Sequence, residues 1–268
     1  MKKQEAEAFV SSGSSGAILV GGQVIVGRSK GVQRPPLAPL IPTQNGVSLL
    51  IDCGANVDAR PEHLVQFAKM GSIYMEDVVG IKNPRVAIVN IGAEEEKGNA
   101  LVKETFPLLK ECPGINFIGS IEARDIPAGY ADVIVCEAFV GNVILKLYEG
   151  LGSTFMKMLK TGLMKDTRSK VGALLVKPAV KETMKAFDAS EYGGAPLLLS
   201  ELNTLKNSVA DFNRPGTAVC LHNQSLKTQK RSSAVLTCIK CLQCVQFRQQ
   251  KINEKIAAHM VEETPEKA

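Results

Sequence analysis

A run of serine and glycine residues near the N-terminus could bind an anion. Residues 11–16 read Ser-Ser-Gly-Ser-Ser-Gly and stand between a short apolar segment and a run of small, apolar residues that predicts a helix. Small side chains let an anion approach backbone N–H groups, and the N-terminus of a helix is electropositive. We therefore predict that Ser11, Gly13, Ser14, Ser15 and Gly16 bind an anionic substrate.

Four further polar segments each follow an apolar one. They are residues 52–58, 90–98, 122–125 and 137–142, the last with Lys146 one helical turn further on. Parallel α/β sheets bind ligands at the carboxyl ends of their strands, so these segments are the expected rim of an active site. Purely structural roles stay open for some of these residues: Asp52 and Asp58 could cap helices, and residues 94–96 could be the solvated start of a helix.

The alternation of apolar and amphipathic segments predicts an α/β fold. Continuous apolar runs, such as residues 47–53, are typical of strands that are covered on both faces. Strands are expected at residues 6–10, 47–53, 85–91, 115–119 and 132–136, helices at 14–28, 61–79, 98–110 and 140–159, and a proline-rich connection at 34–42. Strands joined by crossover helices form a mainly parallel sheet with helices on both faces. The five polar segments would then share one edge of that sheet.

The pattern changes after the last of these strands. Residues 162–185 predict another helix, which would form a projecting hairpin with the preceding one over about residues 140–185. Between residues 200 and 233 only 10 of the 34 residues are apolar, which predicts an irregular segment. We expect an α/β domain over residues 1–199, the irregular segment at 200–233, and a C-terminal helix within 234–268 that packs on the domain.

Composition excludes several classes of protein. A hydrophobic share of 45% excludes a wholly disordered or collagen-like chain, and a charged share of 22% argues against a polytopic membrane protein. The net charge of +5 is concentrated between residues 146 and 185, where nine Lys and Arg face three Asp and Glu. This distribution does not suit a general nucleic-acid binder. It suits an acidic partner or an anionic surface.

The sequence contains no convincing metal or nucleotide motif. Cys238, Cys241 and Cys244 have metal-like spacing, but one helix cannot wrap three thiolates around an ion. The glycine patterns of dinucleotide and P-loop sites do not occur. Seven cysteines, an odd number, together with no convincing export signal, indicate free thiols in the cytoplasm. We therefore expect neither a cofactor nor a metal.

Several long segments closely resemble the PlsX-type phosphate acyltransferases. They read IDCGANVDARPEHLVQFAKMGSIYMEDVVGI, RVAIVNIGAEEEKGN, INFIGSIEARDIP, ADVIVCEAFVGNVILKLYEGL and SEYGGAPLL, and the resemblance runs from about residue 7 to residue 198. It implies a three-layer α/β/α fold, similar to isocitrate and isopropylmalate dehydrogenases, in a homodimer. It also implies transfer of a fatty acyl group from acyl carrier protein to inorganic phosphate, which yields an acyl phosphate for phospholipid synthesis.

The resemblance suggests a role for each polar segment. Phosphate is already a nucleophile and a thiolate leaves readily, so this reaction needs charge compensation and orientation. Lys97, Arg124 and Lys146 are expected to supply positive charge, and Asn56 and Asn142 to donate to the thioester oxygen. Beside the Ser/Gly run, the expected substrate-binding residues are Asp52, Gly54, Gly98 and Gly141.

Departures from the family pattern leave a second hypothesis open. The usual first strand and its Asp-x-Met-Gly-Gly-Asp turn do not precede the match, and Ser14-Ser15 stands where the family has Asn-Thr. The alternative is an inactive fragment that binds only a partner or a membrane. Apolar hairpin residues bracketed by cations favour peripheral contact with the inner face of the plasma membrane, or else a dimer contact. A glycerol-3-phosphate acyltransferase is a further expected partner.

Overall fold

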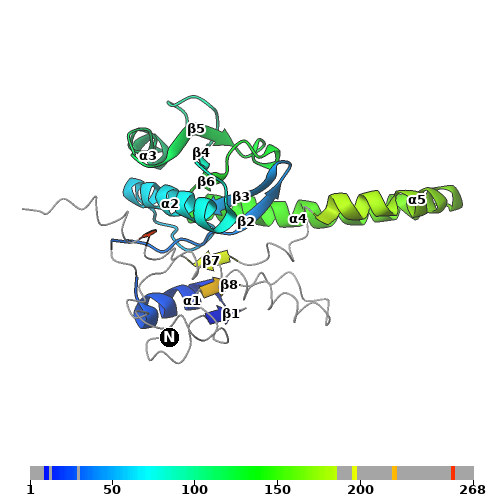
Figure 1. Ribbon diagram of the computed structural model, residues 1–268, viewed down its shortest axis with the longest axis horizontal. Helices are drawn as coiled ribbons and strands as arrows, with labels where there is room; N and C mark the ends of the chain where they lie inside the picture. The colour runs from blue at the N-terminus through cyan, green and yellow to red at the C-terminus, as the bar shows by residue number, and fades with distance from the viewer. Residues whose placement is uncertain are drawn as a thin grey trace, which may run out of the picture.

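The main sheet lies at the centre of the molecule. The computed structural model describes residues 9–11, 14–28 and 31–185, and the short segments 195–197, 219–221 and 255–256. Within these residues the main sheet has five strands in the order β2-β3-β6-β4-β5 (Figure 1). The strands are β2 (Leu40–Thr43), β3 (Gly46–Ile51), β4 (Arg85–Asn90), β5 (Asn116–Glu122) and β6 (Val133–Val135). All neighbouring pairs are parallel except β2 and β3, which confirms the predicted α/β fold with a mainly parallel sheet.

Helices cover both faces of this sheet and so make three layers. On one face, Leu49 and Ile51 of β3 pack with residues of α2 (Pro61–Tyr74) and α3 (Ala100–Lys110). On the other face, Leu50 of β3 packs with Ile144 in the first turns of α4 (Ala138–Leu163). Successive side chains of a strand point to opposite faces, so a strand covered twice must be apolar throughout. This explains the continuous apolar runs from which the strands were predicted.

Two glycines determine how closely α2 packs on the sheet and where the helix ends. A Cβ atom added at Gly71 would lie 2.5 Å from Cγ1 of Val133 in β6, so glycine permits the short distance between helix and strand. The helix continues as a π-helical turn, η2 (Met75–Val79), and stops at Gly80, whose φ of +87° favours glycine. The predicted helix over residues 61–79 is thus confirmed, in two parts.

An edge strand occupies part of the proline-rich segment that was expected to be only a connection. β2 pairs with β3 in antiparallel register, with Pro42 opposite Val47. Proline has no N–H to donate to a ladder, which makes it tolerable at the edge of a sheet but not at its centre. The expectation of an irregular connection is therefore wrong for residues 40–42.

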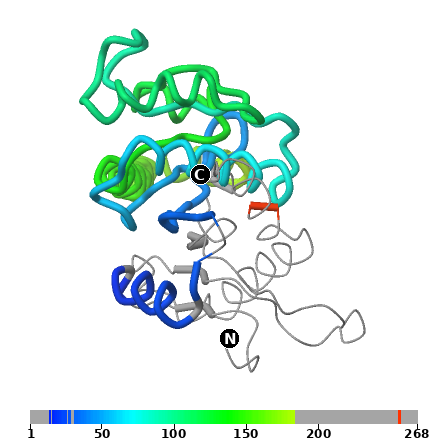
Figure 2. The backbone as a smooth tube through the Cα atoms, turned by 90° about the vertical axis from the view of Figure 1, so that its left-hand side faces the viewer, coloured from blue at the N-terminus to red at the C-terminus, as the bar shows by residue number. Residues whose placement is uncertain are grey.

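The predicted helical hairpin is present and projects from the domain. α4 extends away from the sheet, and α5 (Thr167–Lys185) lies against it beyond a short turn (Figure 1). Figure 2 shows the hairpin end-on beside the sheet. Cβ atoms added at Gly150, Gly152, Gly162 or Gly172 would meet nothing within 4 Å, so much of the hairpin surface is open. None of the described helices combines the length and apolar character needed to cross a bilayer.

The first predicted strand does not belong to the main sheet. β1 (Phe9–Ser11) pairs with β8 (Val219–Leu221), which pairs with β7 (Ala195–Leu197), and these three strands form a separate sheet (Figures 1 and 2). The expectation that all five polar segments share one edge is therefore wrong, because only four follow strands of the main sheet. A short strand carries no local pattern that says which sheet it joins.

Two other expectations about the chain ends have different outcomes. The helix predicted at residues 14–28 forms as α1 (Ser15–Gly21) and a π-helical turn, η1 (Gly22–Val26), in which Ile18 is buried and Val24 is 73% exposed. β8 lies inside the stretch for which irregular structure was predicted. Most of the predicted C-terminal helix lies outside the described residues, but Ile256 packs in the core beside α2, and Lys255 pairs with Asp77.

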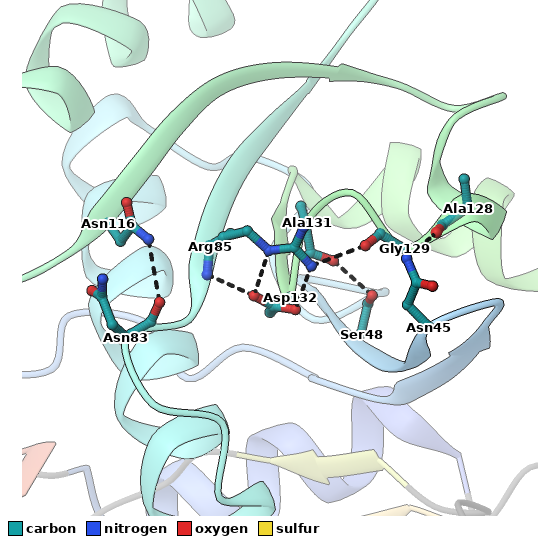
Figure 3. Close-up of polar contacts among 9 residues, drawn as sticks. All are labelled: Asn45, Ser48, Asn83, Arg85, Asn116, Ala128, Gly129, Ala131 and Asp132. Atoms are coloured by element: carbon teal, nitrogen blue, oxygen red, sulfur yellow. Dashed lines mark hydrogen bonds and ion pairs between the residues drawn. The ribbon is translucent and has the colours of Figure 1, made fainter.

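A bidentate ion pair fixes the amino ends of two central strands. The Arg85 guanidinium donates to both carboxylate oxygens of Asp132, at 2.9 and 3.0 Å, and to the carbonyl oxygen of Gly129 (Figure 3). The Arg85 backbone N–H also donates to Asp132, at 2.8 Å. Beside them, Ser48 of β3 donates to the carbonyl oxygen of Ala131 (Figure 3). Hydrogen bonding to Asp132 raises the pKa of Arg85 above its ordinary value.

Replacing Asp132 with Ala should therefore destabilise the protein. Loss of charge-assisted hydrogen bonds to a carboxylate that is only 14% exposed should lower the free energy of unfolding by about 1.5–3 kcal/mol. Chemical denaturation measures this change. Lys110→Gln is the matched control, because the pair between Lys110 and Glu95 is more than half exposed on both sides and should contribute about 1 kcal/mol or less. Equal losses in the two variants would contradict a structural role for the Arg85–Asp132 pair.

Candidate active site

Four of the predicted segments meet at the carboxyl edge of the main sheet. They follow β3, β6, β4 and β5, which are parallel and adjacent in that order. After β3 and β4 the chain runs to α2 and α3 on one face, whereas after β6 it runs to α4 on the other face. Open α/β sheets bind their ligands at such a change of direction. The structure thus brings the candidate residues together in two neighbouring pairs of segments.

A buried carboxylate organises the first pair. The Asp52 side chain is fully buried, and Oδ1 accepts from the backbone N–H groups of Leu37 at 2.9 Å and Ala55 at 3.1 Å. Oδ2 accepts from the backbone and side-chain nitrogens of Asn56, at 2.7 and 2.8 Å. Burial raises the pKa of Asp52, while these four donors oppose the rise. Because neither oxygen faces solvent, any contribution of Asp52 to substrate binding is indirect.

Asn56 also directs its side chain inward. It is 6% exposed, and the two hydrogens of its amide nitrogen go to Asp52 and to the carbonyl oxygen of Pro35, at 2.9 Å. Donation to a thioester oxygen, the role expected from the resemblance, would require one of these bonds to break. The geometry instead makes Asn56 part of the support beneath the edge.

Two glycines allow the start of α4 to pack against the segment that contains Asp52 and Asn56. A Cβ atom added at Gly141 would lie 1.9 Å from the carbonyl oxygen of Asp52, a distance that no side chain could occupy. Gly54 has a φ of +122°, and a Cβ atom there would lie 3.9 Å from Oδ1 of Asn142. The exposed Asn142 side chain therefore lies next to the segment that follows β3. Because Gly141 has no side chain, α4 can lie directly against the carbonyl oxygen of Asp52.

The N-terminus of α4 is capped by a residue that the sequence analysis did not single out. The Glu137 carboxylate accepts from the backbone N–H groups of Phe139 and Val140, at 2.6 and 2.9 Å. An acidic residue directly before a helical run was the available signal. Further along the same helix, Lys146 is exposed and pairs with Glu149 at 3.1 Å.

The second pair of segments presents two exposed cations. Lys97 pairs with Glu94 at 2.8 Å, and a hydrogen bond to Glu94 raises the pKa of Lys97, with a smaller contribution from Glu122 at the end of β5. Arg124 pairs with the same Glu122 at 3.1 Å and is 76% exposed. Exposed ion pairs contribute little free energy, so their cations remain able to exchange a carboxylate for another anion.

Asn90 ties the segment that follows β4 to strand β5 and was not predicted as a site residue. Its amide nitrogen donates to the carbonyl oxygen of Lys97 and to Ser120 of β5, both at 3.1 Å. Gly98, with a φ of +107°, lies so close that an added Cβ would be 2.5 Å from Oδ1 of Asn90. Gly98 therefore shapes the turn that presents Lys97.

The predicted serine and glycine run lies elsewhere. Ser11 belongs to β1, Ser15 and Gly16 open α1, and the exposed Ser14 precedes them, whereas Gly13 lies outside the described residues. In both overall views α1 lies below the main sheet (Figures 1 and 2). An anion site at this run stays a prediction. Among the described residues, no group of three or more His, Cys, Asp or Glu side chains could hold a metal ion.

Most of the sequence matches known proteins. A family model described as fatty acid synthesis protein matches residues 1–206. The chain belongs to this family. Two relatives named phosphate acyltransferase are 56% identical over 198 residues, in Alkaliphilus oremlandii, and 48% identical over 230 residues, in Clostridium acetobutylicum. These matches cover 74% and 84% of this chain, and 59% and 69% of the respective relatives.

The matched region is thus little more than half of the first relative's length. Two solved structures are similar to parts of the chain: a phosphotransacetylase of Streptococcus pyogenes, with a TM-score of 0.47 and 19% identity, and the EutD phosphotransacetylase of Staphylococcus aureus, with 0.44 and 18%. Each similarity covers 57% of this chain and 53% of the other.

Removing the Asp52 carboxylate should collapse the support of the edge. Asp52→Ala would leave four donors without their acceptor in a buried region, so the free energy of unfolding should fall by roughly 3 kcal/mol or more. Chemical denaturation measures the loss. Asp58→Asn changes an exposed carboxylate of the same segment and should change the stability by about 0.5 kcal/mol or less. A stable Asp52→Ala protein would show that the hydrogen-bonded carboxylate does not hold these segments.

Proposed function

We propose that this chain carries the active-site edge of an enzyme that transfers a fatty acyl group from acyl carrier protein to inorganic phosphate. The observation that carries the proposal is the pair of exposed cations, Lys97 and Arg124, at the ends of adjacent strands. The name phosphate acyltransferase of the relatives supports the same reaction. The acyl phosphate would then be used for phospholipid synthesis in the cytoplasm, where a glycerol-3-phosphate acyltransferase would consume it.

The proposed reaction needs no covalent intermediate on the protein. A phosphate oxygen attacks the thioester carbonyl carbon, the new C–O bond forms, and the C–S bond breaks to release the carrier's thiolate. Lys97 and Arg124 would bind the phosphate, and Asn142 would donate to the oxygen on which negative charge develops. Lys146, one turn further along α4, would add positive charge. Cys53 and Cys136 are buried, and burial raises the pKa of both thiols, so neither is suited to act as a nucleophile.

The reaction class has a direct test. The full chain, incubated with long-chain acyl carrier protein, should form acyl phosphate only when inorganic phosphate is added, because phosphate is the acyl acceptor. Mass spectrometry of the product, or a hydroxylamine assay for acyl phosphate, measures it. Omission of phosphate is the control. Phosphate-independent release of the carrier, or turnover of a nicotinamide cofactor, would contradict the proposed function.

Each of the two cations should affect the use of phosphate. Lys97→Ala and Arg124→Ala should each raise the KM for phosphate roughly tenfold, because a charge-assisted bond to the anion is lost. Steady-state kinetics at varied phosphate concentration measures this effect. Lys103→Ala removes an exposed lysine of α3 that does not belong to the predicted site, and it should leave the KM unchanged. An equal loss of activity in Cys136→Ser would argue for a thiol nucleophile instead.

The hairpin offers apolar surface for two further contacts. Exposed apolar residues recur at spacings of three or four along α4, which suits a second copy of the chain in a homodimer; they are Phe139, Val143, Leu147, Leu151, Phe155 and Met158. On α5, Leu174 and Leu175 are 72% and 77% exposed among lysines. Apolar side chains flanked by cations suit peripheral contact with an anionic membrane, on its cytoplasmic face.

Membrane contact can be measured by sedimentation with liposomes. The wild-type chain should sediment with liposomes of anionic lipid at low salt, and Leu174→Glu combined with Leu175→Glu should abolish most of this binding, because two acidic groups would enter the interface. Leu108→Glu, at an exposed position of α3, is the control and should leave binding unchanged. Equal sedimentation of the double variant and the wild type would contradict the membrane contact.

A further inference from the structure

One carboxylate neighbours both cations of the proposed phosphate site. Glu122 is the last residue of β5, in register with Asn90 at the end of β4. Its Oε1 accepts from the Arg124 guanidinium at 3.1 Å. The pKa of Lys97 is raised mainly by its hydrogen bond to Glu94 and further by the charge of Glu122, so Glu122 interacts with this second cation too.

A glycine brings Lys97 close to the end of β4. A Cβ atom added at Gly92 would lie 2.5 Å from Cδ and 3.1 Å from Nζ of Lys97, so the lysine lies across the backbone two residues beyond the strand. β4 and β5 are hydrogen-bonded neighbours, and such strands lie about 4.8 Å apart. The Lys97 ammonium and the Glu122 carboxylate therefore belong to the same small area of the edge.

Glu122 is the least exposed carboxylate among the ion pairs of these two segments. Its side chain is 28% exposed, whereas that of Glu94, the other partner of a site cation, is 57% exposed. A solvated carboxylate such as Glu94 can give way to an incoming anion, since exposed pairs contribute little free energy. Within the residues that the structure describes, nothing donates to Oε2 of Glu122. This oxygen can accept a hydrogen bond from a ligand that carries an O–H group.

We propose that Glu122 is a specificity-determining residue, whose carboxylate accepts a hydrogen bond from an O–H group of the bound oxyanion. The proposal rests on the proposed function, because it takes Lys97 and Arg124 as the groups that bind phosphate. The phosphate dianion keeps one O–H, whereas the sulfate dianion, of similar size and equal charge, has none. Phosphate thus satisfies both cations and the carboxylate, but sulfate would place an anionic oxygen against Glu122. The edge therefore selects protonated oxyanions and rejects unprotonated ones.

Equilibrium dialysis of the full chain with radiolabelled inorganic phosphate tests this selection without requiring acyl transfer. Competing oxyanions are added at constant ionic strength. Arsenate, which has an O–H, should displace phosphate, whereas sulfate and selenate should do so at least about tenfold more weakly, because they cannot donate to the carboxylate. Selenate is similar in size to arsenate, as sulfate is to phosphate, so size does not account for the expected difference.

A charge-neutral variant tests the residue itself. Glu122→Gln should bring the affinities for arsenate and sulfate within about threefold of each other, because the amide can donate to an unprotonated oxygen. Glu95→Gln is the matched control: Glu95 pairs with Lys110, not with the site cations, and this variant should discriminate as the wild type does. Circular dichroism checks that both variants fold, and if Glu122→Gln does not, the discrimination by the wild type decides.

The outcomes separate this proposal from the proposed function. Displacement of phosphate by sulfate as readily as by arsenate would overturn the role of Glu122 and leave the proposed function standing. So would a folded Glu122→Gln chain that discriminates as strongly as the wild type. A full chain that binds no phosphate would overturn the proposed function, and the role of Glu122 with it.

Discussion

Four N–H groups donate to the Asp52 carboxylate in a region closed to solvent, and the carboxyl edge of the sheet depends on this arrangement. Burying a carboxylate is unfavourable unless donors replace the water it loses. Here the replacement comes from three chain positions, Leu37, Ala55 and Asn56. Their donation fixes the segment before β2 and the segment after β3 in one arrangement.

The segment around Asp52 also contacts α4, on the other side of the sheet, at Gly141. The carbonyl oxygen of Asp52 lies where the Cβ atom of residue 141 would be, so α4 can start against the end of β3 only because Gly141 has no side chain. That position presents Asn142 and, one turn on, Lys146. The turn that presents Lys97 depends in turn on the Asn90 amide, which donates to the carbonyl oxygen of Lys97 and to Ser120 of β5. The exposed cations of the edge are thus supported by the side-chain amides of Asn56 and Asn90 and by the Asp52 carboxylate, which form hydrogen bonds within the protein.

The sequence predicts the central strands because their constraint is local: a strand covered on both faces is mostly apolar, as β6 is throughout and β3 is from Leu49 to Ile51. It does not predict the sheet that β1 joins, since a three-residue strand pairs through contacts made by β8, more than two hundred residues away. Pro42 and the prolines that precede β2 also masked an edge strand. Candidate cations such as Lys97 were found from their place after a strand. The inward roles of Asp52 and Asn56 could not be found in this way, because hydrogen-bond partners such as Pro35 and Leu37 are known only from the folded chain.

α4 joins two surfaces of different chemistry, with polar and charged groups at its N-terminus and exposed apolar side chains toward its C-terminus. The account rests on the edge as the site where an anion binds. Hydrogen–deuterium exchange of the full chain, with inorganic phosphate and with sodium chloride of equal ionic strength, tests this most directly. The account predicts that phosphate slows exchange in residues 91–98 and 122–125, and that it does so more strongly there than in residues 14–21. Slower exchange confined to residues 14–21, or no effect of phosphate on either edge segment, would contradict it.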